Sequence, residues 1–422
     1  MPSPDRIPNR DSPQRAAESL LILDISRLVY ATWTRTPTGI PRVELAYARH
    51  FIAKEPDRLR FVVLDAIGRL RIVKTEAAIG FVRAISAYWN EGVSSTGAYA
   101  RLILRALRLY TGLLLRPGND MNRLVAGLGS RVIYVIPSQL QLERSAQVER
   151  LKQAGDVKIV YFVHDILPAL MPDYFEDGAP ERTRRRLTNA ARLVDAIVAN
   201  SQATADAFRD RFGQSLPPSF VTVAPLGVNR PARPSGTAKP PAPYFVMLGT
   251  IEPRKNHLLI LQCWRNLLGL APDRMPTLVV IGSRGWKNRE VFDILDRPAE
   301  LQGFVREHGK VADTDVTELL MGARALLMPS LAEGFGLPLS EALAVGTPVI
   351  CSDISVFREV GAGVPDYLDP ADEPAWRAAI LDYSEPDSLR RRRQLRRLAA
   401  WSPPTWRDHF KRVEATLGAL EN

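Results

Sequence analysis

Two glutamates, Glu333 and Glu341, are separated by seven residues, and Gly334 and Gly336 follow the first of them closely. The glycines permit a tight loop that a ligand can approach, and Pro338 suits the first position of a helix. The backbone N–H groups of such a loop, together with the positive end of a helix, favour a bound phosphate. The spacing therefore predicts a phosphate site bordered by two carboxylates.

Two adjacent cations, Arg254 and Lys255, follow Gly249 and a predicted strand at residues 244–248. Open α/β sheets bind ligands at the carboxyl ends of their strands. Arginine offers a planar fork and lysine a point charge, so the pair suits a diphosphate. Alone, such a pair would indicate only the solvated start of a helix, but its place after the strand favours a ligand site.

His164 and Asp165 end another predicted strand, residues 157–163, and His164 is one of only five histidines. Its place at the end of a parallel strand favours a site residue over a structural one. The D-x-D motif at Asp313-Thr314-Asp315 is typical of metal sites, but it precedes a helix-like stretch, so we expect it to cap that helix. The sequence contains no H-E-x-x-H zinc motif, and we expect no metal.

Short apolar runs that alternate with amphipathic stretches must position these residues. This alternation indicates βαβ units and mainly parallel sheets. The predicted strands are residues 20–26, 59–65, 132–136, 157–163, 196–199, 221–224, 244–248, 277–281, 325–328 and 348–351. Predicted helices include 42–51, 141–153, 183–193 and 405–420. Five prolines in residues 230–243 indicate a linker between two α/β halves.

The composition limits the class of protein. The 422 residues allow two or three domains, and 46% apolar with 24% charged residues is typical of a globular protein. The formal charge of +10 favours anionic partners. Two cysteines exclude a disulfide framework and fit a reducing compartment. Residues 1–14 lack the apolar core of a signal peptide, and no run has the length of a membrane span, so we expect a cytosolic chain.

Several motifs resemble those of retaining GT-B glycosyltransferases of family 4. EGFGLPLSEALAVGTPV (residues 333–349) resembles the family signature, LGTIEPRKN (248–256) the first loop of its C-terminal domain, and FVHDILP (162–168) its His-Asp loop. Shorter matches at residues 38–42 (TGIPR), 199–201 (ANS) and 225–228 (PLGV) lie in the expected order. Together the motifs span about residues 20 to 350.

The resemblance implies an α/β GT-B fold, in which two Rossmann-like domains face each other across a cleft. The N-terminal domain, residues 18–235, would bind the acceptor, and residues 242–402 would bind the nucleotide sugar. Residues 403–422 would form a helix that packs back on the N-terminal domain.

The resemblance also implies roles for single residues. Glu333 and His164 are the catalytic candidates: Glu333 would hold hydroxyls of the donor sugar, and His164 would lie beside that sugar. Glu341 would bind the ribose. The other donor-binding candidates are Gly39, Arg254, Lys255, Val311, Asp313, Gly334, Phe335, Gly336 and Leu337. Of these, Arg254 and Lys255 would hold the diphosphate, and the loop with Val311 and Asp313 would contact the base.

The implied reaction moves a hexose from a nucleotide-diphosphate donor to a glycan acceptor, with retention at the anomeric carbon. LGTIEPRKN resembles bacterial mannosyltransferases of polysaccharide assembly, which favours GDP-mannose. Arg254, Lys255 and the loop amides can neutralise the leaving diphosphate, so no cofactor or metal is expected. Three alternatives remain: a nucleotide-sugar 2-epimerase with the same fold, a non-catalytic nucleotide-sugar binding protein, and a basic nucleic-acid-binding module.

Three basic segments indicate whether the protein binds a membrane or a nucleic acid. Residues 101–115 place Arg101, Arg105 and Arg108 on one helix face and leucines 102, 109 and 113 on another. Such a helix either lies on an anionic membrane or is a core helix with a solvated face. Arginine clusters at residues 182–186 and 390–397 lack the interleaved aromatic residues of nucleic-acid sites. Since many acceptors of the family are lipid-linked, we expect a polyprenyl-linked glycan acceptor, a location at the inner face of the cytoplasmic membrane, and no nucleic-acid partner.

Overall fold

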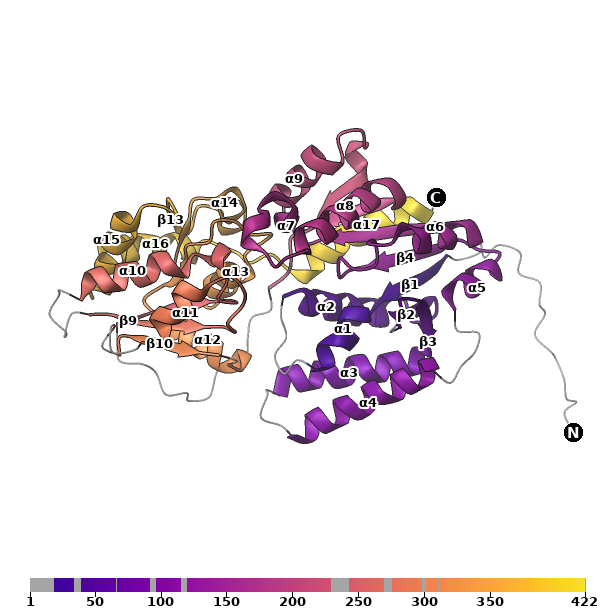
Figure 1. The fold of residues 1–422 in the computed structure, drawn as a ribbon, viewed down its shortest axis with the longest axis horizontal. Helices are drawn as coiled ribbons and strands as arrows, with labels where there is room; N and C mark the ends of the chain where they lie inside the picture. The colour runs from indigo at the N-terminus through magenta and orange to yellow at the C-terminus, as the bar shows by residue number, and fades with distance from the viewer. Residues whose placement is uncertain are drawn as a thin grey trace, which may run out of the picture.

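The computed structural model describes residues 19–33, 39–65, 67–91, 96–114, 120–228, 243–268, 275–297, 301, 303–309 and 311–421. These residues form two α/β units, each built around one sheet, with the C-terminal helix returning to the first unit (Figure 1). The predicted pair of Rossmann-like units is confirmed. The proposed linker, except for Pro243, and Thr38 of the TGIPR motif lie outside the described residues.

The sheet of the N-terminal unit has the order β3-β2-β1-β4-β5-β6-β7. Its strands are β1 (Leu20–Asp24), β2 (Leu59–Leu64), β3 (Leu70–Val73), β4 (Val132–Ile136), β5 (Val157–Val163), β6 (Ala196–Ala199) and β7 (Val221–Val223). All neighbours are parallel except β2 and β3, which form an antiparallel hairpin. Strand β3 was not predicted, because it is a short edge strand whose middle residues are only half-buried.

The sheet of the C-terminal unit has the order β10-β9-β8-β11-β12-β13 and is parallel throughout. Its strands are β8 (Tyr244–Leu248), β9 (Thr277–Ile281), β10 (Val305–His308), β11 (Leu326–Met328), β12 (Val349–Ser352) and β13 (Asp366–Leu368). The two edge strands, β10 and β13, were not predicted. Both lack the continuous apolar run of a fully buried parallel strand: residues of β10 alternate between half-buried and exposed, and the three residues of β13 are all half-buried.

Helices cover both sheets. In the N-terminal unit they are α1 (Ser26–Tyr30), α2 (Gly39–Lys54), α3 (Thr75–Glu91), α4 (Thr96–Leu114), α5 (Met121–Ala126), α6 (Ser145–Ala154), α7 (Leu167–Leu170), α8 (Ala179–Leu193) and α9 (Gln202–Phe212). In the C-terminal unit they are α10 (His257–Leu267), α11 (Arg289–Leu295), α12 (Asp313–Gly322), α13 (Leu337–Ala344), α14 (Ser355–Gly361), α15 (Glu373–Ser384) and α16 (Leu389–Ala399). The helix predicted from residue 141 begins only at Ser145, since Gln141 has a positive φ of 78°.

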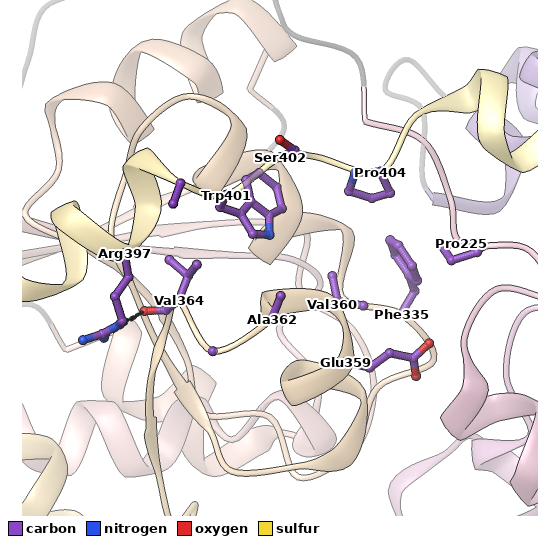
Figure 2. Close-up of a pocket in the computed structure, with 12 residues that line it drawn as sticks. Pro225, Phe335, Glu359, Val360, Ala362, Val364, Arg397, Trp401, Ser402 and Pro404 are labelled. Atoms are coloured by element: carbon purple, nitrogen blue, oxygen red, sulfur yellow. Dashed lines mark hydrogen bonds between the residues drawn. The ribbon is translucent and has the colours of Figure 1, made fainter.

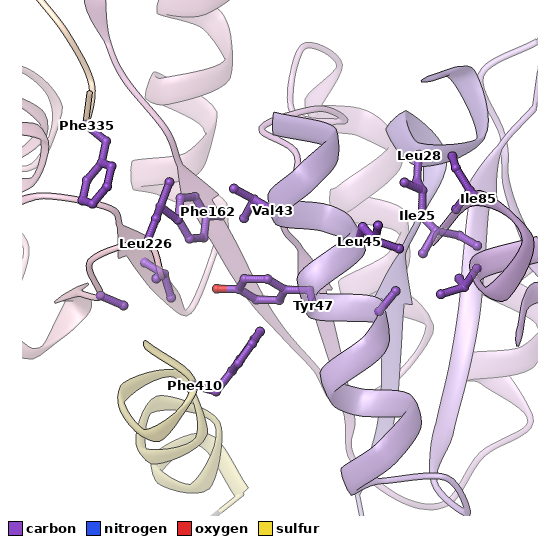
Figure 3. Close-up of a cluster of buried hydrophobic side chains, with 14 of the residues drawn as sticks. Ile25, Leu28, Val43, Leu45, Tyr47, Ile85, Phe162, Leu226, Phe335 and Phe410 are labelled. Atoms are coloured by element: carbon purple, nitrogen blue, oxygen red, sulfur yellow. The ribbon is translucent and has the colours of Figure 1, made fainter. Parts of the chain in front are cut away.

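The last helix, α17 (Trp406–Glu421), packs against the N-terminal unit. Figure 3 shows Phe410 beside Tyr47 of α2, and the centroids of the two rings are 5.1 Å apart. His409 Nε2 lies 3.0 Å from the Tyr47 hydroxyl, and Val413 and Leu417 are buried in the same core. The chain therefore crosses between the units twice.

The leucines of α4 are core residues. Leu102, Leu109 and Leu113 are buried against α3, so the core interpretation of these three leucines is confirmed. Arg101, Arg105 and Arg108 are exposed, and Leu104 and Leu107, which are about half exposed, lie on the outer face with them. In the part of the chain that the structure describes, no helix is both long and apolar enough to cross a membrane.

The two arginine clusters are partly fixed by the fold. On α16, Arg390 and Arg397 both bind the Asp366 carboxylate of β13, at 2.5 and 2.6 Å, and Arg391 donates to the Arg324 carbonyl at 3.0 Å. On α8, Arg186 pairs with Glu143. These arginines are therefore held by contacts within the fold.

Candidate functional site

The candidate site lies where loops from the carboxyl ends of both sheets meet. The loop after β11 touches the N-terminal unit directly, because the Gly334 carbonyl accepts hydrogen bonds from Ser201 Oγ (2.8 Å) and Thr204 Oγ1 (3.1 Å). A Cβ at Gly334 would lie 2.4 Å from the His164 carbonyl oxygen. The two loops thus pack backbone against backbone, which requires glycine at residue 334.

A compact group of charges occupies the C-terminal side. Arg254 binds Glu333 at 2.8 Å, Lys255 binds the other oxygen of the same carboxylate, and Arg254 also pairs with Glu252. The side chains of Arg254, Lys255 and Glu333 are each at most 13% exposed. Lys255 extends over Gly249, and its Cε lies 3.5 Å from where a Cβ would be. The two predicted phosphate cations and the predicted catalytic glutamate are therefore brought into direct contact.

The protonation of this group follows from burial and pairing. Burial alone would raise the pKa of Glu333, but Lys255 and Arg254 outweigh it and lower that pKa to about 2. Burial likewise opposes the charge of Arg254, and Glu333 with Glu252 reverses this, so the pKa of Arg254 is raised. At neutral pH Glu333 is a carboxylate held between two cations.

His164 lies on the N-terminal side of the same junction and is nearly fully buried. Its Nε2 is 2.7 Å from the Pro137 carbonyl oxygen, which can only accept, so Nε2 carries the proton and Nδ1 the lone pair. Burial lowers the pKa of His164 to about 3, against the opposing effect of that hydrogen bond. The ring is therefore neutral at neutral pH.

A third group joins the two units through Arg42, in the first turn of α2. Its guanidinium binds Glu341 of α13 at 3.1 Å and Asp313 of α12 at 2.6 Å. The pKa of Glu341 is raised overall, because the effect of burial exceeds the opposing effect of Arg42. The structure thus places Glu341 and Asp313, the two carboxylates predicted to bind ribose and base, on one cation.

Other predicted donor-binding residues surround these groups. Gly39 faces Leu337 across the units, at 3.6 Å from Leu337 Cδ1 to the Cβ position of the glycine. Gly336 has a φ of 90° and precedes α13, whose first residue is Leu337, so Pro338 is the second residue of the helix and not the first as predicted. Val311 is half-buried against the core beside α12.

Phe335, another predicted donor-binding residue, has a buried ring. This ring lines a cavity of about 600 Å³ together with Pro225, Trp401 and Pro404, as Figure 2 shows. The ring therefore lies beside the crossing segment before α17.

The predicted capping role of the D-x-D motif is wrong. The N-cap of α12 is Ala312, with no side-chain capping bond, and Asp313 is the first helical residue. Asp313 pairs with Arg42 instead. Within the described residues, no group of three or more His, Cys, Asp or Glu side chains is placed to hold a metal ion.

Sequence reasoning missed Arg42 and Glu252. Arg42 belongs to the TGIPR motif, and its position just after the loop that follows the first sheet strand was the available signal. Glu252 lies in the LGTIEPRKN motif, two residues before Arg254, and this closeness was the available signal.

Comparisons with known proteins agree with this geometry. A model described as "Glycosyl transferases group 1" matches residues 229–373, and one described as "Glycosyltransferase Family 4" matches residues 121–230. Together they run from residue 121 to residue 373, which is more than half of the chain.

Among similar curated proteins, the "O-antigen chain mannosyltransferase B" of Escherichia coli is 36% identical over 163 residues, covering 39% of this chain and 42% of that protein. The "O-antigen chain mannosyltransferase RfbU" of Salmonella typhimurium is 34% identical over 152 residues, covering 35% and 40%. The chain thus spans less than half of the length of these relatives.

Two solved structures share the architecture. Anabaena Alr3699/HepE in complex with UDP has a TM-score of 0.60 at 14% identity and covers 95% of this chain and 100% of that one. Sucrose-phosphate synthase from Thermosynechococcus elongatus has a TM-score of 0.59 at the same identity and coverage. The family matches and the two facing parallel sheets together show that the chain belongs to the group 1 and family 4 glycosyltransferases and has the GT-B fold.

Proposed function

We propose that the protein is a retaining hexosyltransferase that moves a sugar, with mannose from GDP-mannose favoured, from a nucleotide-diphosphate donor to a glycan acceptor. The contact of Arg254 and Lys255 with Glu333, in a loop whose Gly334 packs on the His164 backbone, carries this proposal. Names of two relatives, both O-antigen chain mannosyltransferases, support the sugar and a role in surface polysaccharide assembly.

The cations have the chemistry of a leaving-group site. A departing nucleoside diphosphate gains negative charge in the transition state, and fixed cations in a partly buried cleft stabilise that charge strongly. Arg254 and Lys255 would move part of their pairing from Glu333 to the diphosphate. Glu333 would then accept hydrogen bonds from hydroxyls of the donor sugar.

The protonation states support a retaining reaction assisted by the leaving group. Glu333, with a pKa of about 2, and His164, with a pKa of about 3, are both weak bases. The leaving phosphate oxygen is thus a better acceptor for the proton of the attacking hydroxyl. His164 would act as a neutral residue whose Nδ1 lone pair accepts a hydrogen bond from a donor hydroxyl.

The acceptor proposed here is a glycan, polyprenyl-linked, at the inner face of the cytoplasmic membrane. The outer face of α4 supports membrane contact, because exposed Leu104 and Leu107 lie among exposed Arg101, Arg105 and Arg108. This combination suits the interface of an anionic bilayer.

A donor panel tests the proposal. The purified protein would be incubated with GDP-mannose, UDP-glucose and UDP-N-acetylglucosamine, and nucleotide release would be measured with and without EDTA. We expect GDP release from GDP-mannose, undiminished by EDTA, and, with a glycan acceptor present, a transfer product of unchanged anomeric configuration by NMR. Epimer formation would favour the 2-epimerase alternative, and binding without turnover the non-catalytic one. Loss of activity in EDTA with rescue by Mn²⁺ would contradict metal independence.

A further inference from the structure

Arg42 joins the two units at the carboxylates proposed to read the nucleotide. Its Nη1 lies 3.1 Å from Glu341 Oε1, and its Nη2 lies 2.6 Å from Asp313 Oδ1. The three side chains are between 29% and 48% exposed, so the pairs lie at the rim of the junction and not in the core. A ligand can therefore reach them.

The pairing of Glu341 conflicts with its proposed role. Among the described residues, Arg42 provides the only side-chain hydrogen bond recorded for the Glu341 carboxylate. A ribose diol that binds both oxygens of Glu341 must compete with this guanidinium for Oε1. Arg42 likewise engages one oxygen of Asp313, Oδ1, at the shorter distance of 2.6 Å.

We propose that Arg42 is a positioning residue that competes with the donor ribose for Glu341 and then holds the two units around the nucleotide through Asp313. This inference rests on the proposed function, since it needs Glu341 to bind ribose. When the donor binds, the ribose replaces Arg42 as the partner of Glu341. The remaining bond between Arg42 and Asp313 keeps the N-terminal unit over the site. Arg42 thus weakens nucleotide binding and supports turnover.

Opposite effects on binding and turnover distinguish this role from a structural one. Arg42→Ala should bind GDP or UDP, whichever the wild type prefers, about threefold to fivefold more tightly, as expected for loss of a competing, partly exposed ion pair. The same variant should have a lower kcat. Arg42→Lys retains the charge but not the planar fork of arginine. Its nucleotide affinity and its kcat should therefore lie between those of the wild type and those of Arg42→Ala. Affinity would be measured by calorimetry and turnover by nucleotide release.

A matched control separates competition from general opening of the units. Lys287 and Asp177 form another ion pair between the units, at 2.9 Å, and Asp177 is almost fully exposed. Asp177→Ala breaks that pair without touching Glu341 and should leave nucleotide affinity unchanged. An equal gain in affinity in Asp177→Ala would overturn the proposal.

Variants of Glu341 separate failure of this inference from failure of the proposed function. Glu341→Gln should weaken nucleotide binding, and adding Arg42→Ala to it should give no further gain. If Glu341→Gln binds nucleotide like the wild type, the ribose assignment itself is wrong. If Glu341→Gln weakens binding but Arg42→Ala does not tighten it, the competition is wrong and the proposed function stands. Weaker binding in Arg42→Ala would make Arg42 a direct nucleotide ligand and also overturn the proposal.

Discussion

At the scale of single residues, the site consists of opposite charges that already satisfy each other. Glu333 is held by Arg254 and Lys255, and Glu341 and Asp313 share Arg42. An anionic ligand must therefore replace carboxylates rather than fill a bare cationic pocket. Such exchange retains the balance of charge in a buried place, where an unpaired ion would be costly.

Lys255→Ala should weaken binding of the nucleoside diphosphate by about tenfold to a hundredfold, because a hydrogen bond to a charged group contributes roughly 1.5–3 kcal/mol. The fold should persist, since Arg254 still pairs with Glu333. Calorimetric titration with GDP and UDP measures the effect, and Lys411→Ala on the exposed side of α17 is the control. Wild-type affinity in Lys255→Ala would show that the cation does not bind phosphate.

At the scale of helices, strands and loops, the sequence predicted the buried elements well. Continuous apolar runs identified ten strands within one or two residues of their observed bounds. Nine of these strands lie inside the sheets, and the tenth, β7, is an edge strand whose short run is β-branched (Val-Thr-Val). The edge strands β3, β10 and β13 were missed, since half-exposed strands lack that pattern. The site loops were found through their glycines and charges, whereas Arg42 was not assigned, because its partners lie some 300 residues away.

The close approach of two loops at Gly334 gives a prediction at this scale. In Gly334→Ala the new methyl group would lie 2.4 Å from the His164 carbonyl oxygen and 2.9 Å from Asp165 Cβ. The contact joins separate units, so we expect little change in melting temperature and a loss of about a hundredfold in kcat, as for a misplacement of ~1 Å. In Gly112→Ala, where a Cβ meets nothing within 4 Å, activity should be normal. Equal activity of the two variants would contradict the packing argument.

The packing of α17 gives a pH prediction. Burial lowers the pKa of His409 from 6.5 to about 4. Between these two values His409 binds a proton in the unfolded chain but stays neutral in the folded protein. The contribution of neutral His409 to the free energy of unfolding is therefore complete above pH 6.5. It is lost as the pH falls toward 4, and the free energy of unfolding decreases by up to about 1.4 kcal/mol per pH unit.

Urea unfolding between pH 4.5 and 7.5 measures this slope. His409→Gln should have a shallower dependence of the unfolding free energy on pH than the wild type. The exposed His308→Gln should retain the slope of the wild type. An unchanged slope in His409→Gln would mean that another group causes the acid sensitivity.

At the scale of the whole molecule, the net charge of +10 is distributed over surfaces with different roles. Some of the basic residues stabilise the fold: Arg390 and Arg397, for example, bind Asp366. Others, on α4, are exposed beside half-exposed leucines. An arginine held by Asp366 serves the fold, whereas an exposed arginine can also be attracted to an anionic surface.

The protein should therefore pellet with anionic vesicles and not with neutral ones, because each Lys or Arg near such a surface contributes about 1 kcal/mol. High salt should release it, since the attraction is screened beyond about 8 Å at physiological ionic strength. Replacing Arg101, Arg105 and Arg108 with Glu should weaken pelleting. The control carries the same reversal at Arg392, Arg393 and Arg396, on exposed positions of α16. Equal pelleting of both variants would show that α4 is not the membrane contact.

The return of α17 to the first unit has a consequence for synthesis on the ribosome. Phe410, Val413 and Leu417 pack in a core with residues of the first unit such as Tyr47, Phe51 and Phe162. Roughly 180 residues separate β7 from α17, so at 5–20 residues per second this core waits about 10–40 s for its last helix. During that time its apolar surface is open while the second unit is being made. We therefore expect the emerging chain to be prone to aggregation until α17 has left the ribosome and packed.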